Sequence, residues 1–147
     1  MAKPPIPAPV QTSVGFMILE PLTPEALLAR HDLLRLLHES IINDPMSMTE
    51  DALLEEIYER KAIVWTWGQG IIITSFQDTE RGRVLFLSNV RGKGYLANIS
   101  KIDADIESHA KCIGARYIVG DVPSKGLVRV YESRGARTIH RVVREVK

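Results

Sequence analysis

The sequence predicts one α/β (α+β) domain in which helices flank a sheet of short strands. Its 147 residues suit a single domain, and the apolar and charged contents of 45% and 25% are ordinary for a globular protein. Two patterns indicate the fold class. Three β-rich runs separated by glycine-containing turns lie near the middle of the chain, and a long segment with apolar residues every three or four positions follows them. The expected order of elements is β-α-α-β-β-β-α-β-α-β.

Residues 1–12 are expected to lie outside this domain, which leaves residues 13–147 as the folded unit. Prolines occupy positions 4, 5, 7 and 9, so the segment cannot form a helix and favours an extended polyproline II conformation. Two interpretations stay open for it. It is either a disordered tail or an arm that docks on a protein partner or on a second copy of the chain.

Two helices in the first half of the chain are expected to begin at similar signals. Thr23 and Thr49 each provide a capping hydroxyl that is followed by acidic residues, and Pro24 suits the first position of a helix. Apolar residues then recur at helical spacing. We therefore expect helices over residues 23–40 and 49–61.

The later elements follow from the alternation of strand-like runs and turns. The most regular periodicity lies between Leu96 and Ile113 and predicts a long helix that ends at Gly114. A shorter helix is expected over residues 124–133. The expected strands cover residues 16–19, 62–67, 71–76, 84–90, 116–119 and 138–146.

The single cysteine, Cys112, indicates a reducing compartment because it has no partner for an internal disulfide. Its place in the helical pattern predicts a small buried hydrophobe. No apolar run approaches the roughly 20 residues of a membrane span, and residues 1–12 lack the apolar core of a secretory signal. We expect a cytoplasmic protein without a membrane partner.

A glycine-rich turn, Arg91-Gly92-Lys93-Gly94, leads directly into the long helix. Backbone N–H groups at a helix start favour phosphate groups, and glycine allows close approach of the backbone. The turn resembles the acetyl-CoA loop of the GNAT superfamily of N-acetyltransferases, in which Gln or Arg, two residues, Gly, one residue and Gly or Ala follow one another. Arg91 and Gly94 match this pattern, whereas Leu96 departs from it. A shifted register places Asn89, Gly92 and Gly94 at the fixed positions.

This resemblance covers about residues 16–147 and implies a mixed, mainly antiparallel central sheet flanked by helices. It implies acetyl-CoA as the cofactor, no metal, and an amine acceptor on a small molecule or a protein. The cofactor is expected in a gap between the fourth and fifth strands, with Arg91, Gly92, Lys93 and Gly94 at its diphosphate. Backbone donors between Leu87 and Asn89 are expected at the thioester oxygen.

A second segment, from Val130 to Gly135, is similar to the late GNAT segment in which a tyrosine protonates the leaving thiolate. Tyr131 falls on that tyrosine, and a phenol with a pKa near 10 can give up its proton to sulfur. The alternative is that Tyr131 only packs its ring under the sheet. Ala136 stands where the family has an aromatic residue, and Ser124 where an asparagine is frequent.

A general base is harder to assign. The expected fourth strand, residues 84–90, carries no carboxylate. Asp78 and Glu80 in the preceding turn are expected to be too remote, and Asp121 suits a turn before Pro123. The four histidines lack the spacing and the cysteines of a metal site. Activity stays compatible with the sequence because proximity alone supplies much of a rate enhancement.

A third segment, Ile106-Glu107-Ser108-His109-Ala110 ahead of Gly114, resembles a helix of GNAT-like proteins encoded by tailed bacteriophages, some of which are virion components. Residues 116–147 contain eight Lys or Arg against three acidic residues, a charge that suits CoA phosphates or an acidic protein face. Aromatic residues do not interleave with this charge, which argues against nucleic acid. Two functions stay open: an acetyl-CoA-dependent N-acetyltransferase, or a catalytically inactive structural or adaptor protein, including a virion component.

Overall fold

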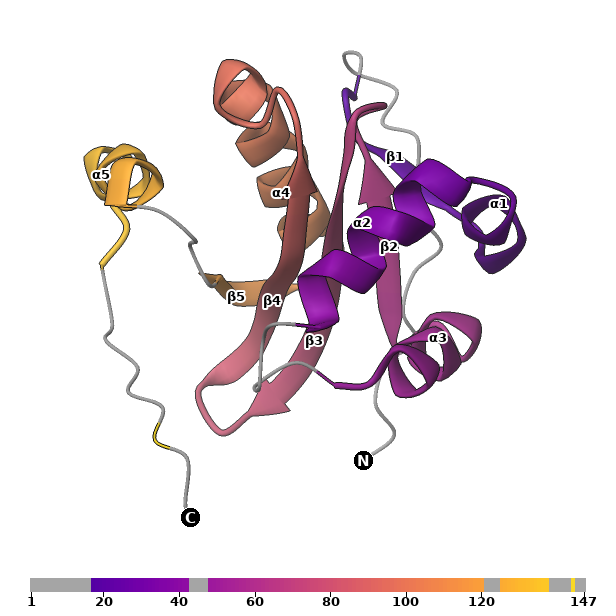
Figure 1. Ribbon diagram of the computed structural model, residues 1–147. Coiled ribbons are helices and arrows are strands. Elements are labelled where there is room, and N and C mark those ends of the chain that lie inside the picture. Colours follow the sequence, from indigo (N-terminus) through magenta and orange to yellow (C-terminus); the bar gives the residue numbers. More distant parts are fainter. Residues whose placement is uncertain (1–16, 43–47, 121–124, 138–143, 145–147) are drawn as a thin grey trace.

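The structure is a computed structural model and describes residues 17–42, 48–120, 125–137 and 144. The proline-rich arm, Asp121, Ser124 and the expected strand 138–146 lie outside the described residues. None of the helices in the described ranges is long and apolar enough to cross a membrane. The elements, labelled in Figure 1, are β1 Glu20–Leu22, α1 Pro24–Leu28, α2 His31–Ile42, α3 Glu50–Tyr58, β2 Ala62–Thr66, β3 Gly70–Thr79, β4 Gly82–Gly92, a 3₁₀ turn Leu96–Asn98, α4 Ile99–Cys112, β5 Ala115–Gly120 and α5 Lys125–Ser133.

The described strands form a single sheet in the order β1-β2-β3-β4-β5. Neighbouring strands are antiparallel from β1 to β4, and β5 lies parallel to β4. A parallel neighbour requires a crossover, and α4 provides it. The expected mixed, mainly antiparallel sheet flanked by helices is confirmed.

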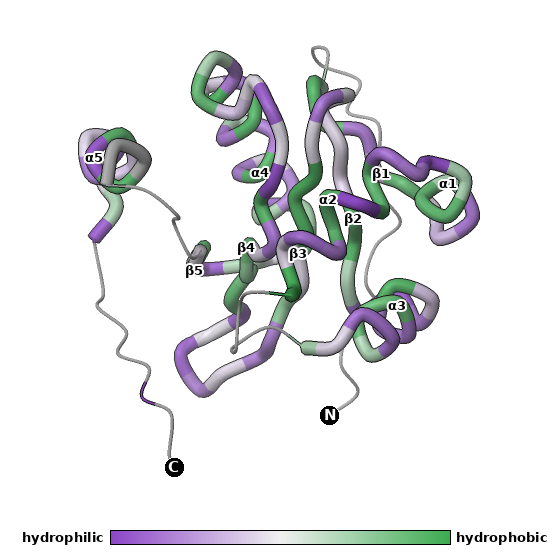
Figure 2. The backbone as a smooth tube through the Cα atoms, viewed as in Figure 1, coloured by the Kyte–Doolittle hydropathy of each residue, from purple (hydrophilic) through white to green (hydrophobic). Residues whose placement is uncertain are grey.

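Helices cover both faces of this sheet, so the domain has three layers. Helix α2 crosses in front of the strands in Figure 1, and α4 lies behind them. Alternate strand residues point to opposite faces. Trp65 and Ile72 therefore join the core beneath α4, while Val64, Ile71 and Ile73 join the core beneath α1, α2 and α3. Figure 2 shows the resulting hydrophobic stretches on the central strands and the hydrophilic β3–β4 hairpin.

The helix expected over residues 23–40 is divided into α1 and α2. The caps are as expected, because the hydroxyls of Thr23 and Thr49 accept hydrogen bonds from the amides of Ala26 at 3.1 Å and Ala52 at 3.3 Å. The break was missed. Asp32 lies in the first turn of α2, where the helix dipole favours an acid, and Arg30 binds it through Nε and Nη2 at 3.0 and 2.8 Å. The bond from Arg30 lowers the pKa of Asp32 to about 2.

The first strand lies later in the chain than the expected 16–19, because a side chain binds that part of the backbone. The amides of Ile18 and Leu19 donate to Oδ2 of Asp105 at 2.7 and 2.9 Å, and only residues 20–22 pair with β2. Asp105 lies on α4 and is buried. The start of the described chain is therefore fixed to the helix that covers the sheet.

One expectation for the long helix is wrong. Cys112 is exposed, because the stripe that faces the sheet consists of Ile102, Ile106, Ala110 and Ile113 and leaves position 112 outside it. Leu96, at the start of this helix, is 58% exposed. The helix starts as a 3₁₀ turn and becomes α-helical only at Ile99.

We expect Asp105→Ala to destabilise the fold by about 2–3 kcal/mol, because it leaves two amides without their charged acceptor. Denaturant unfolding measures this change. Glu107→Ala on the exposed face of the same helix is the control, because its pair with Lys111 at 3.6 Å is exposed and should contribute less than about 0.5 kcal/mol. Equal effects of the two substitutions would show that Asp105 does not hold the N-terminal segment.

Candidate functional site

The described pairing between β4 and β5 covers the first half of β4. The parallel ladder runs from Arg83–Ala115 to Leu87–Gly120, whereas β4 continues to Gly92. In the part of the chain that the structure describes, the last residues of β4 therefore have a strand partner only in β3. The gap expected between the two strands beside the glycine-rich turn stays a prediction, because residues 121–124, which follow Gly120, lie outside the described residues.

A β-bulge at Asn89 follows the last described pair of β4 with β5. The register between β3 and β4 shifts between the pairs Ile73–Ser88 and Ile71–Arg91, and Asn89 has a φ of 53°. Asparagine tolerates this left-handed conformation better than most residues. Its Nδ2 donates to Oγ of Ser40 on α2 at 2.8 Å, and a bulge bends the strand that carries it. Asn89 therefore bends β4 just after its last described pair with β5.

The glycine-rich turn packs against the turn between β2 and β3. A side chain at Gly92 would place its Cβ 2.3 Å from Cα of Gly70, and Gly92 has a φ of 126°. The amide of Lys93 donates to the carbonyl of Gln69 at 3.3 Å, and Nε1 of Trp67 donates to the carbonyl of Lys93 at 2.6 Å. The first glycine of the turn thus serves close packing within the fold.

The helix start beyond this turn has the character of an anion site. Asn98 closes the turn through its amide and its Nδ2, which donate to the carbonyl of Gly94 at 3.2 and 2.8 Å. The N–H groups of a first helical turn have no acceptor within the helix and carry its positive dipole end. The side chains of Arg91 and Lys93 are exposed beside them. Leu96 adds an exposed apolar side chain at the same place.

Helix α5 brings Tyr131 to this helix start. The hydroxyl of Tyr131 shares a hydrogen bond with the hydroxyl of Tyr95, which directly follows Gly94. The ring of Tyr95 packs against Trp67 with centroids 5.6 Å apart. Burial raises the pKa of both phenols, so both stay protonated at neutral pH. The structure thus joins two segments that the sequence analysis treated separately, and Tyr95 and Trp67 are residues that it missed.

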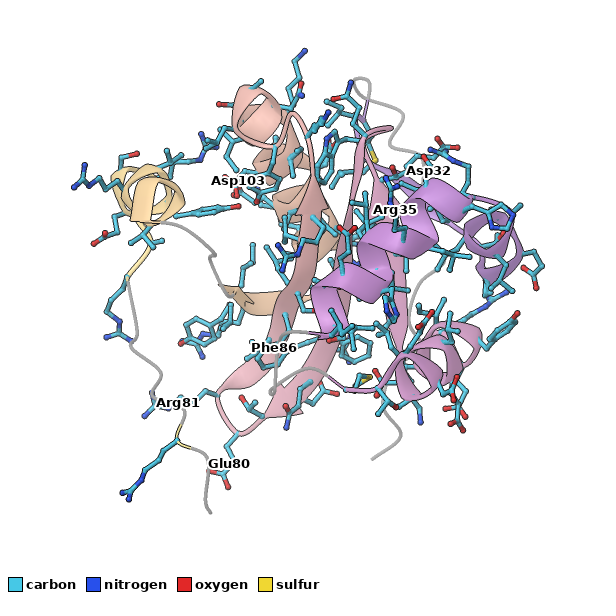
Figure 3. All side chains as sticks on the ribbon, in the orientation of Figure 1. Asp32, Arg35, Glu80, Arg81, Phe86 and Asp103 are labelled. Atoms are coloured by element: carbon cyan, nitrogen blue, oxygen red, sulfur yellow. The ribbon has the colours of Figure 1, made fainter. Side chains whose placement is uncertain are left out.

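An ion pair fastens α5 to α4 next to the two phenols. Nε of Arg134 lies 2.8 Å from Oδ2 of Asp103, and Figure 3 shows Asp103 on the side of α4 that faces α5. Neither residue had been assigned a role from the sequence. Arg134 belongs to the segment around Tyr131, whereas nothing local marks Asp103. The pair links the end of α5 to α4, the helix that follows the glycine-rich turn.

The acids considered as a base lie at the other end of β4. Asp78 and Glu80 flank the β3–β4 hairpin, and Figure 3 shows Glu80 at its tip, far from Asp103. Oδ1 of Asp78 binds Nε of Arg83 at 2.7 Å, and Arg83 also donates to the carbonyl of Ile113 at 2.8 Å. The remoteness expected for these two acids is confirmed. Arg83 of this hairpin thus links β4 to the end of α4.

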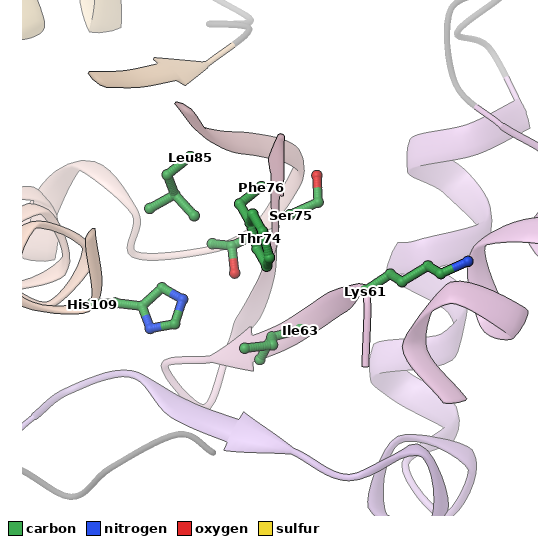
Figure 4. A pocket seen from close by; sticks show the side chains of 7 residues that line it. All are labelled: Lys61, Ile63, Thr74, Ser75, Phe76, Leu85 and His109. Carbon is green, nitrogen blue, oxygen red and sulfur yellow. The ribbon is translucent and has the colours of Figure 1, made fainter. Parts of the chain in front are cut away.

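A small cavity beneath α4 is separate from this site. It has a volume of about 10 Å³, enough for roughly one water molecule, and Figure 4 shows it between His109, Thr74 and Phe76. His109 packs edge-on against Trp65 with ring centroids 5.0 Å apart, and burial lowers its pKa. This histidine is part of the packing beneath α4. The cavity is too small for a cofactor.

Comparison with known proteins places this geometry in a structural context. No protein-family model matches the sequence, and no curated protein matches it significantly. Among solved structures, an acetyltransferase of Trypanosoma brucei is 22% identical over 88% of this chain and 98% of that chain, with a TM-score of 0.58. Glucosamine-6-phosphate N-acetyltransferase of Arabidopsis thaliana is 14% identical over 87% and 96%, with a TM-score of 0.57.

A further similar structure is AAC(6')-Iy, which was solved in complex with the bisubstrate analogue CoA-S-monomethyl-acetylneamine. It is 16% identical over 88% of this chain and 96% of that chain, with a TM-score of 0.57. The likeness thus extends over nearly the whole of each acetyltransferase chain. At these identities it establishes the architecture, and we conclude that the chain has a GNAT-like fold.

Proposed function

We propose that the chain is an acetyl-CoA-dependent N-acetyltransferase that acts on an amine of a small molecule or a protein. One observation carries the proposal. The hydroxyl of the half-buried Tyr131 bonds to that of Tyr95 at a helix start that directly follows the exposed, basic Arg91 and Lys93. The similarity to acetyltransferase structures supports the same function.

The residues present fit acetyl-CoA. Arg91 and Lys93 supply positive charge beside the free amides of a helix start, which suits a diphosphate. Gly92 and Gly94, with φ of 126° and 78°, allow the turn that presents these amides. Backbone groups of β4 between Leu87 and Asn89 would face an extended chain of amides that binds beside this strand. When bound, acetyl-CoA supplies the activated acetyl group.

The roles of the chain follow from these positions. A backbone N–H between Leu87 and Asn89 would hold the acyl oxygen and stabilise the charge that develops there. Tyr131 would donate the proton that the leaving sulfur requires, and its raised pKa keeps that proton in place at neutral pH. The single, exposed Cys112 fits a reducing cytoplasmic compartment.

Calorimetry with acetyl-CoA tests the binding site. We expect Arg91→Ala and Lys93→Ala each to weaken binding by roughly 10- to 100-fold, because each removes a charged contact to phosphate, and the loss should shrink at high salt. Arg81→Ala on the distant hairpin is the charge-matched control. Undetectable binding to the unmodified chain at millimolar ligand contradicts the proposal, and so does unchanged binding by a folded Gly94→Trp variant.

Steady-state kinetics with an amine acceptor test the acid. We expect Tyr131→Phe to lower kcat by about 10²- to 10⁴-fold, because the leaving sulfur loses its proton donor. Affinity for acetyl-CoA, measured by calorimetry, should stay close to that of the unmodified chain. Tyr58→Phe, on an exposed tyrosine of α3, is the control and should leave kcat unchanged. Equal kcat values for the two variants would remove Tyr131 from the reaction.

A second candidate function is that of a catalytically inactive structural or adaptor protein. A virion component, as suggested by the sequence, would be one example. Two observations favour it. Strand β4 carries no carboxylate, and Leu96 exposes an apolar side chain next to the glycine-rich turn. In this case residues 1–12 would dock on a partner or on another copy.

Deletion of residues 1–12 tests this second function. If the arm mediates association between copies, the deletion should convert an oligomer into a monomer in analytical ultracentrifugation without changing thermal stability. An Ala substitution of the four prolines is the matched control for the extended conformation. An oligomeric state that is unchanged by deletion excludes a docking arm between copies.

A further inference from the structure

The two phenols at the candidate site are held in place by different parts of the chain. Tyr95 belongs to the turn before α4, and its ring rests on Trp67, whose indole binds the carbonyl of Lys93. Tyr131 belongs to α5, which Arg134 fastens to Asp103 on α4. The hydrogen bond between their hydroxyls therefore joins two independently anchored groups. Such a contact directs the O–H bond of whichever hydroxyl donates.

Only one of the two hydroxyls can donate in this shared hydrogen bond. If Tyr131 donated to Tyr95, its proton would be directed away from any leaving group. If Tyr95 donates, the oxygen of Tyr131 is the acceptor and the proton of Tyr131 points elsewhere. The second arrangement is the one that leaves Tyr131 competent as an acid.

We propose that Tyr95 is a positioning residue for the acid step: its hydroxyl donates to the oxygen of Tyr131 and leaves the proton of Tyr131 for the leaving sulfur. This inference rests on the proposed function. In the transfer, the amine nitrogen bonds to the acyl carbon while the C–S bond breaks and its electron pair stays on sulfur. Sulfur takes the proton of Tyr131, and the proton lost by the amine nitrogen reaches Tyr131 through solvent.

The surrounding charges are consistent with this direction of donation. Burial raises the pKa of Tyr131, and the bond from Tyr95 counteracts part of that rise because it stabilises the phenolate. The same bond raises the pKa of Tyr95 further beyond what burial does. Asp103 on α4 raises the pKa of both phenols, and Arg134, which directly follows α5, lowers that of Tyr131. Once Tyr131 has given up its proton, Tyr95 is therefore the donor that stabilises its phenolate.

The kinetic test is Tyr95→Phe, which keeps the ring on Trp67 and removes only the donor. We expect kcat to fall about 10- to 100-fold, as for the loss of one hydrogen bond to a charged group, with the KM for acetyl-CoA within about twofold. The alkaline limb of the kcat profile should move to higher pH, because Tyr131 loses the donor that stabilises its phenolate. An unchanged alkaline limb and unchanged kcat overturn the proposal.

A titration of tyrosinate absorbance in the free chain gives a readout without activity. The chain has four tyrosines, of which Tyr58 and Tyr117 are exposed and Tyr95 and Tyr131 form the half-buried pair. In Tyr95→Phe the remaining buried phenol should titrate at higher pH than the first buried phenol of the unmodified chain, whereas Tyr58→Phe should leave the buried pair unchanged. A lower pH in Tyr95→Phe shows that Tyr95 is not the donor. Absent acetyl-CoA binding would instead refute the proposed function, and the titration would still decide the direction of the shared bond.

Discussion

The contact between Gly70 and Gly92 determines where the candidate site lies. It brings the β2–β3 turn against the β4–α4 turn with no space for a Cβ at either glycine, and Trp67 closes it through the carbonyl of Lys93. Trp67 also belongs to the core beneath α4 and supports the ring of Tyr95. Because one side chain serves all three contacts, the position of the turn depends on the packing of the sheet. A site built on such a rigid element keeps its geometry without a bound ligand.

The position of α5 depends on weaker forces than the position of α4. Arg134 and Asp103 are both partly exposed, and exposed ion pairs contribute little to stability. Tyr95 and Tyr131 are half-buried, and their hydroxyls add a hydrogen bond between the turn before α4 and α5. The ion pair and this hydrogen bond therefore act together to hold α5 beside α4. The candidate acid is thus held by the residue that we propose to orient it.

Local signals in the sequence predicted the elements that depend on neighbouring residues. Thr23 and Thr49 cap their helices as expected, and the hairpins follow the glycine-containing turns. Such local signals do not predict contacts between residues that lie far apart in the sequence. Asp105 binds the backbone of Ile18 across 87 positions, and Tyr95 meets Tyr131 across 36. The glycine-rich turn was predicted from the sequence. Its pattern does not show which glycine is needed for close packing against Gly70 and which would be needed for a phosphate.

The charge pattern of β4 decides what kind of transferase this site can be. The strand contains no acid, and the acids nearest in sequence lie on the hairpin at its far end, where Asp78 binds Arg83. In the proposed reaction Tyr131 would give a proton to the leaving group, and β4 offers no carboxylate to accept one from the amine. A neutral amine would lose its proton to solvent after it attacks, and proximity to the acyl carbon would provide much of the acceleration. The proposed transfer would therefore depend on the Tyr131 proton and not on a base carried by β4.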